Sequence, residues 1–538
     1  MTVLAQATQA AQAAQATQVA QGVVQSVDWL AISPPTIAAV AGLAVLVADL
    51  FVSERGKRAL GVISAVGVLL AALPLLFLRT ENIRTFCLPG GSQECAYYAD
   101  SFTLVVQFLV LGAAFVTALL SMPAVRELGL PAGEYWFLLL SATAGAVLIP
   151  ASRDLVTLVI ALEVASLPAF ALVGLRRGSR RSAEAALKFF LTSVAATAVT
   201  LLGASFLYAV TGTLNLYGIA DGLTEADPQL ATLGTAGVAL TLIGFAFKAA
   251  VVPFHFWIPD TYVGAPVPVA AFLSVVGKTA GLSGLILLVL HAFPSRSEIW
   301  GPALAVFAAL TMTVGNAAAL RQRADRAHGA VRLLAWSSVG QAGYLLVPLA
   351  AAAPDAEGRP GQALSAVGAT VAYLLMYAAV NLGAFAVVAH ISRADGATRT
   401  NRANRLDDYR GLAAAHPLAA LALGFFLLCL AGLPPGVIGL FAKVAVFSTA
   451  VRNGLGWLAV IMAVNVVIAL YYYLRWTALL FRPAPEPAVT TTALATATAR
   501  RPRISTPLSV TIALTAVTGI ILSVDPDLVL TFAADGLR

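Results

Sequence analysis

Apolar stretches of about 20 residues recur along the chain, and each is long enough to cross a bilayer as an α-helix. Short polar loops separate them. The run at 416–451 is too long for one regular span and too short for two spans with a loop. Counting it once, the pattern predicts 14 spans near residues 36–53, 59–78, 102–121, 134–150, 154–174, 183–210, 232–258, 266–291, 299–320, 329–351, 363–391, 416–451, 455–481 and 505–531.

Basic residues in the loops predict the orientation of the spans. With 416–451 as one broken span, one set of alternate loops carries 22 Arg and Lys residues and the opposite set carries 7. Loops rich in Arg and Lys face the cytoplasm, so both termini are predicted to be extracytoplasmic. Splitting the run into two spans would place the basic cluster at 475–503 outside, which argues for one broken span.

Composition agrees with an all-α polytopic membrane protein. The mean hydropathy is +0.86, and only 11% of the 538 residues are charged. The net charge of +7 resides in the loops, so it indicates membrane topology and not nucleic-acid binding. Residues 1–30 are rich in Ala, Gln and Thr and lack the basic start and apolar core of a signal peptide. They are predicted to form a low-complexity extracytoplasmic extension.

Two spans contain prolines near mid-depth. Pro253 interrupts the seventh span, and Pro434 and Pro435 interrupt the twelfth. An ordinary proline kink explains either break alone but not their matched placement. Matched interruptions in two halves are typical of inverted repeats. Spans 4–8 and 9–13 are therefore predicted to be two inverted five-helix repeats with broken helices 7 and 12. The predicted units are 31–130 (spans 1–3), 131–292 (first repeat), 298–482 (second repeat), 483–504 (cytoplasmic loop) and 505–538 (span 14 and C-terminus).

Lysine is rare, and its distribution is unusual. Of five lysines, Lys57 lies in a charged loop, whereas Lys188, Lys248, Lys278 and Lys443 lie within apolar runs. A charge at the bilayer centre costs roughly 2.5–3.5 kcal/mol on insertion scales. Burial makes lysine release its proton readily, whereas arginine stays charged. The pattern indicates groups that take up and release protons inside the membrane.

Four of these membrane residues form the main candidate site. Lys248 lies beside the first break, and Glu163 in the fifth span is a candidate acid partner that would favour the charged lysine. Lys278 lies about 18 Å along its span, too deep for its ammonium to reach water easily. Lys443 follows the second break. The alternative for Glu163, Lys248 and Lys443 is a structural role, as a helix-fastening acid, a static ion pair or a buried cation.

Lys188 and His255 are weaker candidates for a proton relay. Lys188 lies one turn inside its span with Glu184 four residues earlier, so a helix-surface ion pair is as good an explanation. His255 adjoins the first break and titrates near neutral pH, although a lone histidine often serves packing or hydrogen bonding.

The cysteines indicate no metal site. Cys87 and Cys95 share one polar loop on the predicted outer side, where a disulfide is plausible, and Cys429 fits a core position. We find no metal-binding, flavin, nucleotide or iron–sulfur motif, so any redox chemistry belongs to other chains.

Several motifs resemble the antiporter-like proton-pumping subunits of respiratory complex I, the NADH–quinone oxidoreductase. They cover roughly residues 100–480. The motifs are EAALKFF (184–190), FAFK (245–248), VPFHFWIPD (252–260), YVGAPVP (262–268), AFLS (271–274), LAWSS (334–338), GY (343–344), NLGAF (381–385), LPP (433–435) and FAK (441–443).

Within this family the chain is most similar to the subunit N type. Lys443 stands where the subunit M type usually has glutamate, and the chain lacks the long lateral helix of the subunit L type. One departure is Val331, because the family often has lysine just before the arginine equivalent to Arg332. That difference puts one relay position in doubt.

The resemblance implies roles for the candidate residues. Glu163 would tune Lys248, Lys278 would link two half-channels, and Lys443 would pass protons toward the far side. NAD, FMN, iron–sulfur clusters and quinone would be bound by partner subunits of complex I, in a bacterial plasma membrane. The alternatives are a subunit of a multisubunit sodium/proton antiporter and a structural membrane subunit that pumps nothing.

Overall fold

The computed structural model describes residues 27–78, 82–87, 94–353, 360–393, 404–483 and 505–525. Side chains of α16 are described from 363 to 392. The predicted N-terminal extension lies almost entirely outside these residues, and so do nearly all of the predicted loop 483–504 and the C-terminus after 525.

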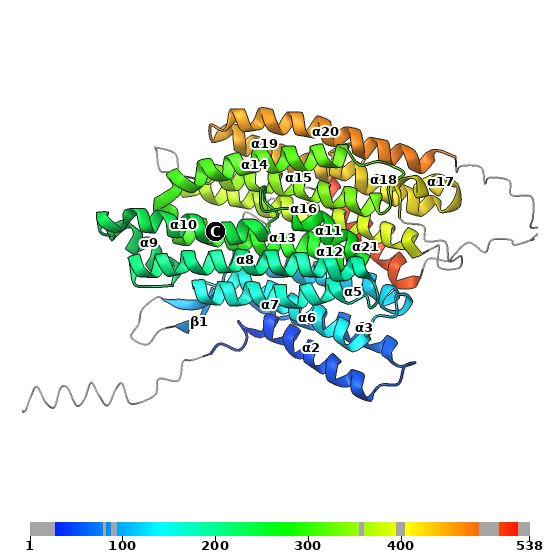
Figure 1. The fold of residues 1–538 in the computed structure, drawn as a ribbon, viewed down its shortest axis with the longest axis horizontal. Coiled ribbons are helices and arrows are strands. Elements are labelled where there is room, and N and C mark those ends of the chain that lie inside the picture. Colours follow the sequence, from blue (N-terminus) through cyan, green and yellow to red (C-terminus); the bar gives the residue numbers. More distant parts are fainter. Residues whose placement is uncertain are drawn as a thin grey trace, which may run out of the picture.

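Long helices run side by side through the molecule (Figure 1). Thirteen of the described helical segments are long and apolar enough to cross a membrane. The helices of the N-terminal part are α2 (Ser33–Phe51), α3 (Lys57–Ala72), α4 (Pro74–Phe77), α5 (Ser101–Glu127), α6 (Ala132–Leu148), α7 (Leu155–Gly174), α8 (Arg180–Thr211), α9 (Leu216–Glu225), α10 (Ala231–Lys248), α11 (Trp257–Gly264), α12 (Val267–Phe272) and α13 (Lys278–Leu287). The remaining helices are α14 (Ser297–Leu320), α15 (Gly329–Ala351), α16 (Pro360–Arg393), α17 (Leu412–Ala415), α18 (Pro417–Ala431), α19 (Val437–Arg452), α20 (Gly456–Phe481) and α21 (Thr506–Val524).

The twelfth predicted span consists of two short helices. α18 and α19 follow one another along the direction of the bundle (Figure 1), as one broken span over 416–451 requires. α18 ends where Gly432 adopts φ +84°, a left-handed conformation that glycine accepts without steric penalty. A cis peptide bond joins Pro434 to Pro435 in the connection.

The seventh and eighth spans are also irregular. α10 ends at Lys248, and α11 begins at Trp257 after a loop that contains the cis Val252–Pro253 bond. In the eighth span a π-helical turn, Leu273–Gly277, separates α12 from α13 and ends directly before Lys278. The sequence pattern did not predict this turn, since all of its residues are compatible with a regular helix.

Polar side chains fix where several helices begin. Asp100 accepts a hydrogen bond from the backbone N–H of Thr103 at the start of α5. Asp154 caps α7 and Ser179 caps α8 in the same manner. Such caps satisfy amide groups that have no partner within the first helical turn.

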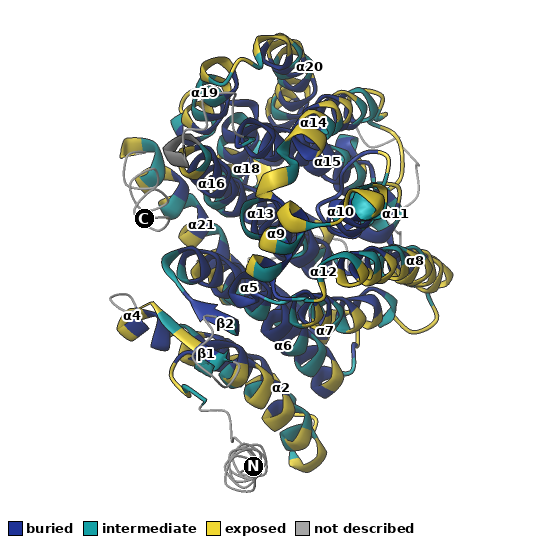
Figure 2. Cartoon of the chain, turned by 90° about the vertical axis from the view of Figure 1, so that its left-hand side faces the viewer, coloured by how far each residue is buried: buried dark blue, intermediate teal, exposed yellow. Residues whose placement is uncertain are grey.

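The core lies along the centre of the bundle. An end-on view shows buried residues in the middle and exposed residues on the rim (Figure 2). Many rim residues are large and apolar, among them Leu50, Phe51, Leu76 and Phe77. An apolar rim is what a bilayer requires, because hydrocarbon cannot hydrogen-bond to polar groups.

A small hairpin precedes α5. Strands β1 (Ile83–Cys87) and β2 (Cys95–Ala99) pair in antiparallel register, with Cys87 opposite Cys95. The two cysteines form a disulfide. The predicted loop between spans two and three is thus partly an ordered, cross-linked hairpin.

Replacing both cysteines with serine should lower the free energy of unfolding by about 2 kcal/mol, because the bond closes a short loop and restricts the unfolded chain. The measurement is thermal unfolding of the detergent-solubilised complex with and without a reductant. Reductant should shift the wild-type protein toward the double variant Cys87→Ser/Cys95→Ser and leave that variant unchanged. A wild-type transition that does not respond to reductant would contradict a stabilising disulfide.

Candidate functional site

Lys248, the last residue of α10, is buried with its ammonium group beside a hydroxyl and three aromatic rings. The side chain donates a hydrogen bond from Nζ to Oγ of Ser193 on α8 at 2.6 Å. The ring centroids of Phe170, Phe189 and Phe247 lie 5.1, 5.5 and 5.8 Å from Nζ. Aromatic faces attract a cation while excluding water. The surroundings can hold an ammonium group but offer it few polar contacts.

Glu163 lies on α7 and is bound by the same neighbouring helix. Oγ1 of Thr197 on α8 donates a hydrogen bond to Oε1 of Glu163 at 2.5 Å. Within the described chain, no ion pair joins Glu163 to Lys248, so the simple contact between acid and lysine is absent. Glu163 and Lys248 instead contact two different hydroxyl groups on α8, those of Thr197 and Ser193. Ser193 and Thr197 are four residues apart and therefore lie on one helix face.

Lys278 begins α13 and reaches across the molecule. It is 1% exposed, and its ammonium donates a hydrogen bond to the backbone carbonyl of Ser338 on α15. Nζ also lies 5.4 Å from the ring centroid of Tyr377 on α16. Lys278 thus connects an element of the predicted first repeat to two elements of the predicted second repeat.

Lys443, on α19, binds the exposed end of α18. Its Nζ donates hydrogen bonds to the carbonyls of Leu430 at 2.9 Å and Ala431 at 2.6 Å. These carbonyls are available because α18 ends at Ala431, and the last carbonyls of a helix have no intrahelical partner. The centroid of the Tyr344 ring lies 5.8 Å from Nζ. The helix break therefore supplies the polar partners of this lysine.

A small cavity of about 20 Å³ lies against Lys443. Its lining includes Gln341, Tyr373 and Tyr377, and the last of these also contacts Lys278. Tyr373 donates a hydrogen bond to Oε1 of Gln341 at 2.5 Å. A cavity of this size accommodates about one water molecule. Polar groups therefore lie on the way from Lys278 to Lys443.

Sequence reasoning missed this glutamine and these tyrosines. Tyr373 and Tyr377 are four residues apart within the apolar eleventh span, and Gln341 and Tyr344 share the tenth. Polar atoms repeating at helical spacing inside two apolar runs were the available signal. Their joint position beside Lys443 depends on tertiary packing, which the sequence alone does not give.

Lys188 belongs to a surface network. It forms ion pairs with Glu184 at 2.8 Å, as predicted, and with Asp260 on α11 at 3.1 Å. Asp260 also pairs with Arg332 on α15 at 3.8 Å. About half of the Lys188 side chain is exposed, so it does not share the buried environment of the other three lysines.

His255 lies in the loop between α10 and α11. The centroid of its ring is 5.6 Å from that of Trp336 on α15. This contact fits packing, and a relay role for His255 stays a prediction.

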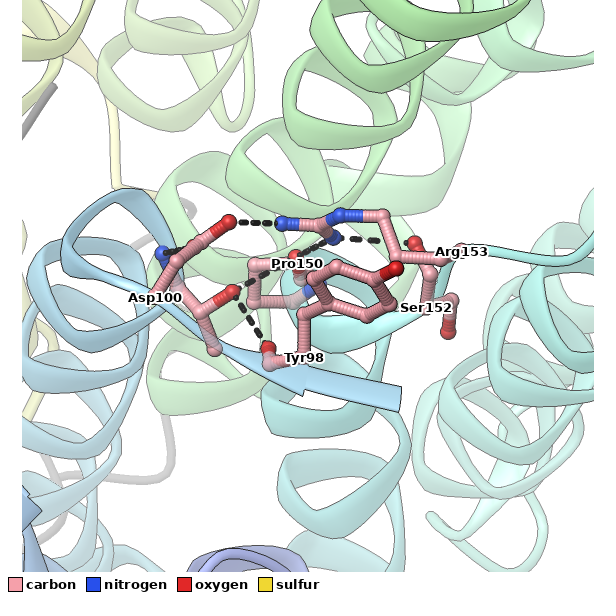
Figure 3. A network of polar contacts seen from close by, with 6 residues as sticks. Tyr98, Asp100, Pro150, Ser152 and Arg153 are labelled. Carbon is pink, nitrogen blue, oxygen red and sulfur yellow. Dashed lines mark hydrogen bonds and ion pairs between the residues drawn. The ribbon is translucent and has the colours of Figure 1, made fainter. Parts of the chain in front are cut away.

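A buried arginine lies just before the N-terminus of α7 (Figure 3). Arg153 is completely buried, and its guanidinium pairs with the Asp100 carboxylate. It also donates hydrogen bonds to the carbonyls of Pro150 at 2.8 Å and Ser152 at 3.0 Å, and it lies 5.2 Å from the Tyr98 ring centroid. The network ties the end of β2 to the turn before α7. In the sequence Arg153 stands between two predicted spans, and nothing local marks its partner 53 residues away.

The environment of Asp100 acts on its pKa in two directions. Burial raises the pKa, whereas Arg153 and the hydrogen bonds from Thr103 and Arg153 lower it, and the balance holds the pKa below its usual range. Asp100 is thus an ionised partner for Arg153 at neutral pH.

Comparisons with known proteins agree with this architecture. The family model described as NADH:quinone oxidoreductase/Mrp antiporter, TM matches residues 152–469. NADH-quinone oxidoreductase subunit N 2 of Streptomyces griseus subsp. griseus is 65% identical over 524 residues, covering 96% of this chain and 95% of the relative. NADH-quinone oxidoreductase subunit N of Salinispora tropica is 45% identical, covering 86% and 88%.

Solved structures show the same fold. A chain of respiratory complex I from Thermus thermophilus, solved with bound aureothin, aligns with a TM-score of 0.71 and 31% identity over 93% of this chain and 99% of that one. A chain of the Mrp complex from Dietzia sp. aligns with a TM-score of 0.76 and 22% identity, over 95% and 96%. Because the family model covers more than half of this chain and the Streptomyces relative nearly all of it, the chain belongs to the NADH:quinone oxidoreductase/Mrp antiporter family and, within it, to the subunit N group.

Proposed function

We propose that this chain is a membrane-arm subunit of an NADH–quinone oxidoreductase and translocates protons from the cytoplasm to the outside. The observation that carries the proposal is the set of three buried lysines, Lys248, Lys278 and Lys443, each held by polar groups inside the bundle. A membrane protein that only needs to pack has no reason to bury three cations without an ion-paired acid. The names of the subunit N relatives support the same function.

In this proposal, protons pass between stations in the order of the two halves. Lys248 with Glu163 forms the first switch, and Lys278 links the halves, which its hydrogen bond to α15 supports. Lys443 is the last station. The two inverted repeats, 131–292 and 298–482, remain part of the proposal. The division into two repeats is supported by two helix ends, that of α10 at Lys248 and that of α18 at Ala431, each in the fourth span of its half.

The energy for transport would come from partner subunits. NADH oxidation through FMN and iron–sulfur clusters, and quinone reduction, would take place there, since this chain carries no motif for those groups. Its surroundings would be the other membrane-arm and peripheral subunits and the bilayer of a bacterial plasma membrane. The excess of Arg and Lys on one set of loops supports termini on the outer side.

Replacing Lys443 with methionine should lower the number of protons pumped per NADH oxidised, because methionine fills a similar volume but carries no proton. The measurement is NADH-driven proton uptake by inverted membrane vesicles, compared with quinone reduction in the same vesicles. The matched control is Lys57→Met, which removes a lysine paired with Glu54 and Asp49 at the surface. An unchanged proton-to-electron ratio in Lys443→Met would argue for a purely structural lysine.

The alternative is a subunit of a multisubunit sodium/proton antiporter. The likeness to the Dietzia chain, at 22% identity, supports a common fold and nothing finer. Proton movement in vesicles driven by a sodium gradient without NADH would favour the antiporter. Co-purification of NADH-oxidising and quinone-binding subunits would favour the oxidoreductase.

A further inference from the structure

We propose that two hydroxyl side chains on α8, Ser193 and Thr197, couple the protonation of Glu163 to that of Lys248. The inference rests on the proposed function, because it concerns how the first proton switch is held together. Ser193 and Thr197 act as positioning residues: they contact the two titratable groups and do not change charge themselves.

The geometry places α8 between the acid and the base. Thr197 donates to Glu163 on one side at 2.5 Å, and Ser193 accepts from Lys248 on the other at 2.6 Å. Side chains four residues apart on a helix have their Cβ atoms about 5–6 Å apart. One water molecule is enough to bridge two hydroxyl groups at that spacing. The acid and the lysine are therefore connected through a pair of hydroxyl groups on one helix face.

Other threonines on α8 behave differently. Thr192 donates to the carbonyl of Lys188 at 2.7 Å, and Thr200 donates to that of Ala196 at 3.0 Å. These bonds return to the helix that carries the side chain, as Ser and Thr commonly do inside helices. Thr197 instead donates to a carboxylate on another helix, and Ser193 accepts from an ammonium on a third. The contrast argues that Ser193 and Thr197 have more than a helix-packing role.

Each hydroxyl group favours the charged form of its partner. A hydroxyl that accepts from an ammonium stabilises the protonated lysine, and one that donates to a carboxylate stabilises the ionised glutamate. While both bonds hold, the charged states of Glu163 and Lys248 support each other. When one of the two loses its charge, its bond weakens and the α8 hydroxyl groups can reorient toward the other residue.

The other charged groups nearby do not disturb this pairing. Among the described residues, no ion pair includes Glu163 or Lys248, whose side chains are bound by Thr197 and Ser193. Asp260 on α11 is occupied with Lys188 and Arg332 at the surface. On α13, which packs against α10, Lys278 is bound to the Ser338 carbonyl.

The test compares Ser193→Ala and Thr197→Val in the assembled complex, in inverted membrane vesicles. The pH dependence of NADH-driven proton pumping should shift by about one pH unit in each variant, which corresponds to losing one hydrogen bond to a charged group. The shifts should have opposite signs: Ser193→Ala toward lower pH, since charged Lys248 loses support, and Thr197→Val toward higher pH, since ionised Glu163 does.

Controls separate coupling from folding. Thr200→Val and Thr192→Val remove hydroxyl groups from the same helix and should leave the pH profile unchanged. Thr197→Ser should restore the wild-type profile. If a variant assembles poorly, infrared difference spectra of the purified complex still report the carboxyl group of Glu163, whose band should change in Thr197→Val and not in Thr200→Val.

The outcomes also separate this inference from the proposed function. Profiles of Ser193→Ala and Thr197→Val that coincide with those of the threonine controls would overturn the coupling, even if Lys248→Met stops pumping. Wild-type pumping in Lys248→Met would overturn the role of Lys248 as the first switch, and absence of NADH-driven pumping by the wild-type complex would overturn the proposed function itself.

Discussion

Lys248→Met should reduce proton pumping coupled to quinone reduction by about 100-fold, since removing a group that transfers a proton typically costs a factor of 10² or more. Methionine fills the space between Phe170, Phe189 and Phe247 but cannot take up a proton or donate to Ser193. Quinone reduction should fall with it, because the two processes are coupled in the proposed function. The measurement is NADH-driven proton uptake and quinone reduction in inverted vesicles.

The same vesicles supply the control. NADH oxidation by an artificial electron acceptor should stay at the wild-type rate, since it needs only the redox subunits, and Lys57→Met should pump normally. If Lys248→Met kept both pumping and quinone reduction at wild-type levels, Lys248 would not be the central switch. Loss of the assembled complex on a native gel would instead indicate a structural lysine.

Asp100→Asn should lower the stability of the folded chain by about 3–5 kcal/mol, the usual cost of leaving a buried ion-pair partner without its counter-charge. Asparagine still caps α5, so the substitution isolates the charge from the helix cap. Arg153 would remain completely buried with only the carbonyls of Pro150 and Ser152 as partners. The measurement is thermal unfolding of the purified complex at neutral pH, together with its yield.

Two comparisons sharpen this experiment. Asp100→Asn combined with Arg153→Met should be less destabilising than Asp100→Asn alone, because no unpaired buried charge is left.

In the wild type the pKa of Asp100 is lowered. Its contribution to the free energy of unfolding is therefore complete above the unfolded pKa, about 3.9, and is lost as the pH falls through the lower folded pKa. Asp100→Asn should lack this acid-dependent loss. Equal stability of wild type and Asp100→Asn would contradict a stabilising pair.

Much of the fold follows from the sequence because the bilayer imposes a simple rule. Apolar length predicts spans, and loop charge favours one broken span at the ambiguous run 416–451, where the structure has two short helices, α18 and α19. The hairpin, the amphipathic helix α9 and the π-turn before Lys278 were not predicted. Each depends on local geometry that an apolarity pattern does not record.

For the site, the sequence singled out the titratable candidates but not the hydroxyl and carbonyl groups that contact Lys248, Lys278 and Lys443. A buried lysine is conspicuous in an apolar run, whereas Ser193 and Thr197 look like ordinary small residues of a membrane helix. Their contacts with Glu163 and Lys248 form only when α7, α8 and α10 pack together. Arg153 is the opposite case: its position between two predicted spans does not mark it as a core residue, and the fold buries it completely.

The hydrogen-bond partners of Lys443 differ in kind from those of Lys248. Backbone carbonyls at the end of α18 neither gain nor lose protons, and the negative end of a helix dipole is constant. Lys248, by contrast, is linked to an acid whose charge can vary. In the proposed path, the first station would therefore be reset by its neighbour, whereas the last would keep a fixed proton affinity until the helices themselves move.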